Sequence, residues 1–194
     1  MSQAVPAVEH IGGEHMDNRK LGMWIFLASE VMLFSSLIAG FLNMKARSPS
    51  GANDVLNVPL TAVNTFILIM SSTTVVMALA AIEDGDRKRL RNFLIATLLL
   101  GATFLSVQMY EYHHLLSEGF TPSASLFGAG FYTVTGFHGL HVLIGLGLCL
   151  YLIVRASREK YSAEEHMPVE VFGLYWHFVD IVWIVLFTII YLLP

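Results

Sequence analysis

Cysteine and charge are what this sequence has least of. A single cysteine, Cys149, occurs in 194 residues, so a disulfide within the chain is excluded, as is any zinc or iron–sulfur site built on several cysteines. A c-type haem attachment is excluded as well, because it needs two cysteines and a following histidine. Charged residues make up 13% of the chain, roughly half the share of a typical soluble domain, so they are too few to cover a globule.

The charge that is present is weakly acidic. The chain has 11 basic and 15 acidic residues and a formal net charge of −4, which argues against nucleic-acid binding because that function needs a basic surface. Hydrophobic residues make up 55% of the chain. This balance indicates that lipid is the solvent for most of the protein surface.

Five long apolar stretches predict an all-α membrane protein, a bundle of five transmembrane helices. A spanning helix needs about 20 mostly apolar residues, and each stretch is too long and continuous for a soluble strand. Residues 1–20 are predicted to form a polar cytoplasmic arm and residues 21–194 a single transmembrane domain. The first few residues of the apolar run that begins at Phe127 are interpreted as loop. The five helices are expected at about 21–44, 59–82, 92–114, 131–154 and 171–193.

Basic residues predict the orientation of the bundle. Cytoplasmic segments of membrane proteins carry the excess of Lys and Arg. Nine basic residues lie on one side of the predicted membrane and two, Lys45 and Arg47, on the other. We therefore expect the N-terminus in the cytoplasm and the C-terminus on the periplasmic side of a bacterial cytoplasmic (inner) membrane. The nine are Arg19, Lys20, Arg87, Lys88, Arg89, Arg91, Arg155, Arg158 and Lys160.

Ionisable side chains within the predicted helices are the candidate functional residues, because such a group costs about 2.5–3.5 kcal/mol near the bilayer centre even on the lenient insertion scale. A rise of about 1.5 Å per residue puts Glu30 and Asp180 at about the same depth. His177 lies one turn shallower, and Ser71 and Ser72 fall near this level. These residues are expected to form an inner polar layer, in which His177 and Asp180 pair with each other or with a neighbouring helix.

A second, outer polar layer is expected from the third and fourth stretches. Gln108 and Glu111 lie at about the same height as His138 and His141. The two histidines at i, i+3 could ligate a metal, with Glu111 as the candidate third ligand, but no third ligand of matching geometry is identifiable. No helix carries the stacked histidine pair of a transmembrane b-haem. Hydrogen-bonded bundle histidines are therefore the interpretation, and no metal or catalytic residue is assigned.

Glu30 differs from the other ionisable groups, because no cation shares the interior of its helix. A carboxyl in such a dry site can carry protons or contact a lipid headgroup, or it can simply donate one hydrogen bond. Both the proton-related and the purely structural interpretation of Glu30 stay open.

Five strings carry a family resemblance. SEVMLF, NTFILIMSST, YEY, FYTVTGFHGLHVLIG and YWHFVDIVWIVLF occur in this order. Together, over about residues 20–193, they resemble subunit III of haem-copper terminal oxidases of the cytochrome c oxidase type. The resemblance implies a non-catalytic, structural subunit of an oxygen-reducing, proton-pumping complex rather than an enzyme on its own. No cofactor is expected on this chain, and the haems and copper are expected in partner subunits.

The resemblance also implies partners and roles. The chain would pack mainly against subunit I, and also against subunit II and membrane phospholipids, and would stabilise subunit I and support its proton uptake. A larger respiratory supercomplex could surround it. Glu30 matches the family's reactive intramembrane carboxyl, and Arg155 matches a phospholipid headgroup contact. The family's buried polar framework corresponds to Glu111, His138, His141, His177 and Asp180.

One departure from the family affects the lipid site. Full-length relatives have seven helices, and this chain lacks the first two, so one wall of the family's lipid cleft is missing unless another subunit supplies it. Lipid binding at Glu30 and Arg155 is therefore open.

Several functions compete with subunit III of a cytochrome c oxidase. The electron donor could be quinol, or the chain could be the accessory subunit of a nitric oxide reductase; the overall string resemblance favours cytochrome c. A proton-coupled transporter that uses Glu30 and Asp180 is a more remote alternative, since the repeats typical of transporters are not visible. The last alternative is a pure scaffold, in which Glu30 is only a packing residue.

Overall fold

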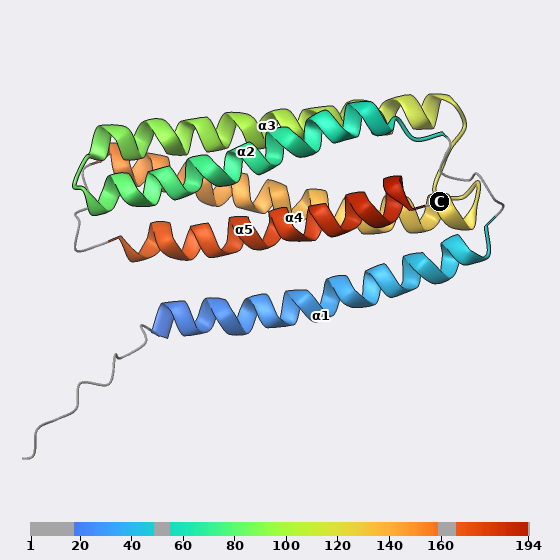
Figure 1. Cartoon of the computed structure of the whole chain (residues 1–194), viewed down its shortest axis with the longest axis horizontal. Helices are drawn as coiled ribbons and strands as arrows, with labels where there is room; N and C mark the ends of the chain where they lie inside the picture. The colour runs from blue at the N-terminus through green and yellow to red at the C-terminus, as the bar shows by residue number, and fades with distance from the viewer. Residues whose placement is uncertain (1–17, 49–54, 159–165, 194) are drawn as a thin grey trace, which may run out of the picture.

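The computed structural model describes residues 18–48, 55–158 and 166–193, and within them the chain forms five long helices that run side by side (Figure 1). All five are long and apolar enough to cross a membrane, which confirms the all-α, five-helix prediction. Residues 1–17 of the predicted arm lie outside the described residues. The helices are α1 (Asn18–Ala46), α2 (Val58–Glu83), α3 (Arg87–Ser117), α4 (Leu126–Ser157) and α5 (Met167–Phe187), which continues as a π-helical turn, η2 (Thr188–Leu192).

Helices α3 and α4 begin before the points that hydropathy predicted, and the interpretation of Phe127 and its neighbours as loop is wrong. The Asp86 side chain accepts a hydrogen bond from the backbone N–H of Arg89, and the Ser125 side chain accepts one from Gly128. Such caps satisfy N–H groups that the first helical turn leaves free. The helices therefore begin before the strictly apolar residues. Hydropathy alone does not detect these first turns.

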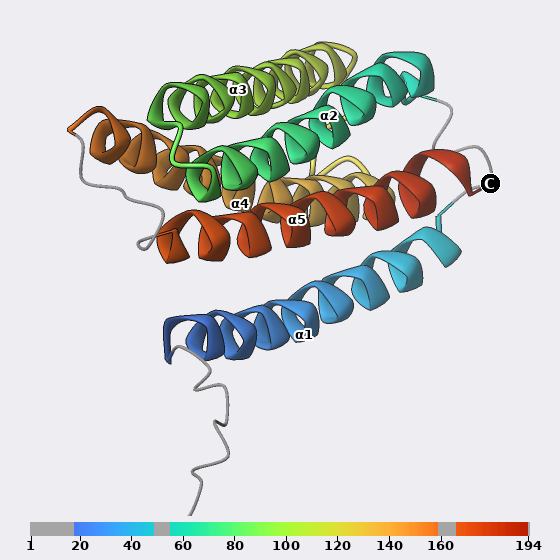
Figure 2. The same ribbon diagram turned by 60° about the vertical axis from the view of Figure 1, so that its left-hand side comes forward.

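Helix α1 lies at the edge of the bundle, and the other four helices pack around a shared core (Figures 1 and 2). It packs against α4 and α5. Its buried side chains, Leu27, Phe34 and Phe41, recur every seven residues along one side of the helix. Most of the remaining surface of α1 is exposed, so it is available to lipid or to another protein.

Two tryptophans of α5 fill the centre of the four-helix core. Trp176 and Trp183 are both essentially fully buried. A side-chain carbon at Gly101 of α3 or Gly145 of α4 would lie 2.9 or 2.6 Å from the Trp176 ring, so these glycines allow three helices to approach one another closely. The indole N–H groups donate to hydroxyls of α2, at Ser71 and Thr65 respectively, both at 2.9 Å.

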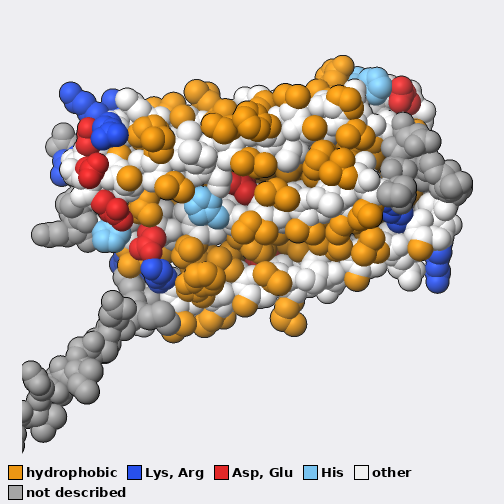
Figure 3. Space-filling view, viewed as in Figure 1, with side chains coloured by type: hydrophobic (Ala, Val, Ile, Leu, Met, Phe, Trp, Pro, Cys, Tyr) orange, Lys and Arg blue, Asp and Glu red, His pale blue; other side chains and the backbone are white. Residues whose placement is uncertain are grey.

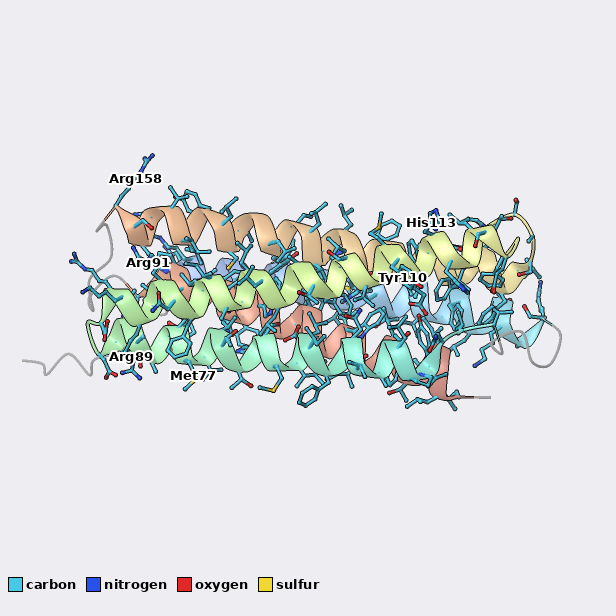
Figure 4. The ribbon with its side chains drawn as sticks, turned by 90° about the horizontal axis from the view of Figure 1, so that it is seen from above. Met77, Arg89, Arg91, Tyr110, His113 and Arg158 are labelled. Carbon is cyan, nitrogen blue, oxygen red and sulfur yellow. The ribbon has the colours of Figure 1, made fainter. Side chains whose placement is uncertain are left out.

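Charged side chains gather at the ends of the bundle, and hydrophobic side chains cover its middle (Figure 3). In Figure 4, Arg89, Arg91 and Arg158 lie at one end, whereas Tyr110 and His113 lie toward the other. Basic residues from separate segments of the chain therefore meet at the same end. This is the charge asymmetry on which the predicted orientation rests.

Candidate functional site

Glu30 of α1 and His141 of α4 form an ion-pair contact across the bundle, with Oε2 of the carboxyl 3.0 Å from Nε2 of the imidazole. The two side chains are 15% and 11% exposed. The predicted layers, which separate Glu30 from His141, are therefore wrong for these two residues, and the partner of Glu30 lies on another helix rather than on its own. Both residues lie near the middle of helices that extend beyond the apolar stretches, and for this reason the depths counted from those stretches were misleading.

The hydrogen bonds of His141 fix how many protons the pair holds. Its Nδ1 lies 2.7 Å from the backbone carbonyl oxygen of Phe137. A carbonyl only accepts hydrogen bonds, so Nδ1 carries a hydrogen. Oε2 of Glu30 and Nε2 of His141 then share one proton, either as a carboxylic acid facing a neutral imidazole or as a carboxylate facing an imidazolium. The pair is neutral overall in both forms, and the proton can pass between the two groups without changing the net charge.

Aromatic side chains enclose the Glu30–His141 pair. The ring of Phe34 meets the imidazole edge to face, with centroids 5.0 Å apart. The hydroxyl of Tyr175 donates to the backbone carbonyl of His141 at 2.8 Å, and Phe26 stacks on Tyr175. Electrostatic interactions are stronger in such an apolar setting than in water, so this setting strengthens the contact between the two side chains.

Glu111 lies in a separate hydrogen-bonded group near the C-terminal end of α3. Its carboxyl accepts from the Thr61 hydroxyl and from the Tyr191 hydroxyl, both at 3.1 Å, and its side chain is buried. Sequence reasoning missed Tyr191, which lies on η2 within the last apolar stretch. The one clue in the sequence is that the hydroxyl of Tyr191 falls near the same side of the predicted membrane as Glu111.

His138 does not share the environment of His141. It is fully buried, stacks on Trp183 with centroids 4.8 Å apart, and meets the edge of Phe104. Neither ring nitrogen has a hydrogen-bond partner among the described residues. Within residues 18–48, 55–158 and 166–193, no three or more His, Cys, Asp or Glu side chains are placed together to hold a metal ion.

His177 finds its partner on another helix rather than on its own. Its Nδ1 is hydrogen-bonded to the Ser72 hydroxyl of α2, which is the second of the two predicted alternatives. Asp180 lies beside Ser72 and is 5% exposed. Neither of its oxygens accepts a hydrogen bond of ordinary geometry from the residues that the structure describes.

Arg155 lies near the end of α4, far from Glu30. Its guanidinium stands over the ring of Tyr151, 5.9 Å from the centroid, and Nη1 is 3.3 Å from the Tyr151 hydroxyl. The helical rise separates Arg155 from His141 by about 21 Å along α4. One lipid headgroup therefore cannot contact both Arg155 and Glu30.

Comparison with known proteins gives a consistent family. Residues 9–193 match the family described as "Cytochrome c oxidase subunit III". Cytochrome c oxidase subunit 3 of Thermostichus vulcanus is 41% identical over 192 residues, which cover 96% of this chain and 92% of that protein. Cytochrome c oxidase subunit 3 of Bacillus sp. (strain PS3) is 36% identical over 178 residues, 91% of this chain and 86% of that protein.

The relatives also include a subunit of a quinol-oxidising enzyme. Cytochrome bo(3) ubiquinol oxidase subunit 3 of Pseudomonas aeruginosa is 37% identical over 179 residues, which cover 91% of this chain and 85% of that protein. The match extends over nearly all of both chains in each comparison, and it includes all five helices of this structure. The chain therefore belongs to the cytochrome c oxidase subunit III family.

Proposed function

We propose that this chain is the non-catalytic subunit III of a respiratory cytochrome c oxidase, a haem-copper complex that reduces oxygen and pumps protons. In this proposal the chain binds no redox cofactor, and the haems and copper lie in partner subunits. It contacts mainly subunit I, which it stabilises, and also subunit II. Family membership supports the subunit role, and the Glu30–His141 pair is the observation that carries the role in proton uptake.

The Glu30–His141 pair is suited to holding a proton beside the proton-pumping subunit. It shares one proton at a 3.0 Å contact and lies between α1 and α4. Both side chains retain partial access from outside the bundle. A proton arriving at the carboxyl can be matched by release from the imidazole, so the pair returns to its starting charge while the proton moves on toward subunit I.

The remaining parts of the proposal concern the membrane. The concentration of basic residues at one end of the bundle supports an N-terminus in the cytoplasm and a C-terminus outside, in a bacterial cytoplasmic membrane. Arg155, at that same end, is proposed to contact a phospholipid headgroup. Glu30 is proposed to contact lipid separately, through the exposed flank of α1, because the two residues are too far apart to share one headgroup.

A quinol oxidase subunit III is the second candidate. The observation that favours it is the 37% identity to the ubiquinol oxidase subunit of Pseudomonas aeruginosa, close to the 36–41% shared with two cytochrome c oxidase subunits. The two candidates share the same role for this chain and differ only in the donor that the complex oxidises.

Purification through a tag on this chain, in mild detergent, tests the proposal. Haem bands in a reduced-minus-oxidised optical spectrum, with peptides of larger partner subunits in the same fraction, are the expected result. Turnover with reduced cytochrome c or with quinol then separates the two candidates. A colourless preparation without partners under the mildest conditions would contradict both.

A further inference from the structure

A small polar cluster interrupts the surface of α2 and α5 at mid-length. Its members are Ser72 on α2 and His177 and Asp180 on α5. The Ser72 hydroxyl is hydrogen-bonded to Nδ1 of His177 and faces the Asp180 carboxyl. Figure 3 shows histidine and acidic side chains in the middle of a face that hydrophobic side chains otherwise cover. The cluster therefore lies at the depth of the hydrocarbon.

The hydrogen-bonding capacity of this cluster is only partly used within the described residues. Ser72 and Nδ1 of His177 share one hydrogen bond, and the tautomer of the imidazole decides which of the two donates. Nε2 of the neutral imidazole is a donor in one tautomer and an acceptor in the other. His177 is half-buried, and its Nε2 has no hydrogen bond to the described residues. The cluster thus presents a polar nitrogen whose hydrogen-bond partner comes from outside the bundle.

An apolar groove adjoins the cluster. It has a volume of about 520 Å³ and runs between α1 and α5, and His177 belongs to both the groove and the cluster. Seven of its lining side chains are hydrophobic: Trp24, Leu27, Ala28, Val31, Leu174, Phe178 and Ile181. A groove of this kind accommodates the apolar side chains of a helix, with a polar contact at one end.

We propose that a transmembrane helix of a partner oxidase subunit docks on this face, with apolar side chains in the groove and a hydrogen-bonding side chain directed at Nε2 of His177. That side chain is a hydroxyl or an amide, either of which can donate or accept. This inference rests on the proposed function, because the oxidase complex supplies the partner. A lipid acyl chain fits the groove but offers no hydrogen-bonding group at this depth, and polar groups in membranes face protein or water rather than hydrocarbon.

The outward face of α4 provides the contrast. Its exposed side chains Phe137, Leu140, Leu143, Ile144 and Leu148 are all hydrophobic. No polar group interrupts this series, so the face meets the requirements of lipid contact. In Figure 1, α4 lies behind α5. The two faces therefore give a matched test and control on the same molecule.

Site-specific photocrosslinking in membranes that contain the whole complex tests the proposal. A photoreactive residue replaces Ile181, 60% exposed beside the groove, or in the control Leu143, 54% exposed on α4. The expected result is an adduct with one oxidase subunit from position 181 and only lipid adducts from position 143. Lipid adducts alone from position 181, equal protein adducts from both positions, or an adduct with a second copy of this chain would overturn it.

Substitution at the cluster gives an independent measure. His177→Leu should lower the fraction of this chain retained in the complex after detergent washing by about three- to twentyfold, the range for one interhelical hydrogen bond. Ser36→Ala, at an exposed α1 hydroxyl that donates to the Met32 carbonyl of its own helix, should leave retention unchanged. Equal retention for both variants overturns the docking proposal. Absence of haem-bearing partners from the unsubstituted preparation instead overturns the proposed function, so the two failures are distinct.

Discussion

Glu30 and His141 lie on different helices, 111 positions apart in the sequence, and yet share a single proton across 3.0 Å. The Phe137 carbonyl holds the other ring nitrogen in its protonated form. The pair is therefore a hydrogen-bonded unit rather than two independent ionisable groups. This unit is the part of the chain with a chemistry that could serve a proton-pumping partner.

Glu30→Gln tests whether this proton matters to the complex. Glutamine keeps the size of the side chain and can still donate to Nε2 of His141, but it cannot titrate. We expect the complex to assemble normally, to pump fewer protons per turnover and to inactivate sooner during turnover. Proton uptake by reconstituted vesicles and the decay of oxygen consumption measure these effects.

Glu111→Gln is the matched control for that experiment. Glu111 is also a buried carboxyl, but it accepts its hydrogen bonds from the Thr61 and Tyr191 hydroxyls, away from the Glu30–His141 pair. It should leave pumping and inactivation at their unsubstituted values. Normal pumping and lifetime in Glu30→Gln would leave Glu30 with a purely structural role.

A double-mutant cycle measures the coupling between Glu30 and His141. Either Glu30→Leu or His141→Leu alone leaves a buried polar partner unsatisfied, at about 1–3 kcal/mol. The double variant removes both groups and should be more stable than the sum of the single effects predicts, by about 0.5–3 kcal/mol. Thermal unfolding of the purified complex, followed through loss of this subunit, provides the values. Strictly additive effects would show that the contact contributes nothing.

Gly145→Ala tests the close approach of α4 to α5. The added methyl carbon would lie 2.6 Å from the Trp176 ring, and the ring is fully buried and cannot move aside. We expect a loss of about 1–3 kcal/mol in stability. Gly147→Ala on the same helix is the control, since nothing lies within 4 Å of its new carbon. It should be neutral or stabilising by up to about 1 kcal/mol. Equal melting temperatures for the two variants would contradict the packing argument.

Lys45→Met tests how the end of α1 is attached to the end of the chain. The Lys45 ammonium donates to the backbone carbonyls of Ile189, at 3.2 Å, and Leu193, at 2.7 Å. Losing these bonds should lower the local opening free energy of η2 by about 1 kcal/mol, which speeds amide exchange about fivefold. Hydrogen exchange read by mass spectrometry measures this change. Arg47→Met, at an exposed position on the same end, should leave the exchange of η2 unaltered.

The placement of the polar residues shows how far sequence reasoning reaches. The helical spacing of Thr61, Asn64, Leu68, Ser71 and Val75 puts them on one face of α2, and all five are buried. Partners within one helix follow from spacing alone, whereas partners on other helices do not. The hydrogen bond between His177 and Ser72, and the one that the Tyr191 hydroxyl donates to Glu111, depend on how each helix is rotated and shifted against its neighbours.

The sequence by itself determined the five spans, the separation of charge between the two ends, the candidate ionisable residues and the family resemblance. Each of these depends on local composition or on strings of residues, and hydrocarbon as a solvent imposes strict limits on both. Only the tertiary structure decided that Glu30 meets His141, because the axial offset between α1 and α4 sets that contact. The offset comes from side-chain packing, including Phe34 against His141 and Phe41 against Phe127. Such packing is a property of several helices together, and no single stretch of sequence contains it.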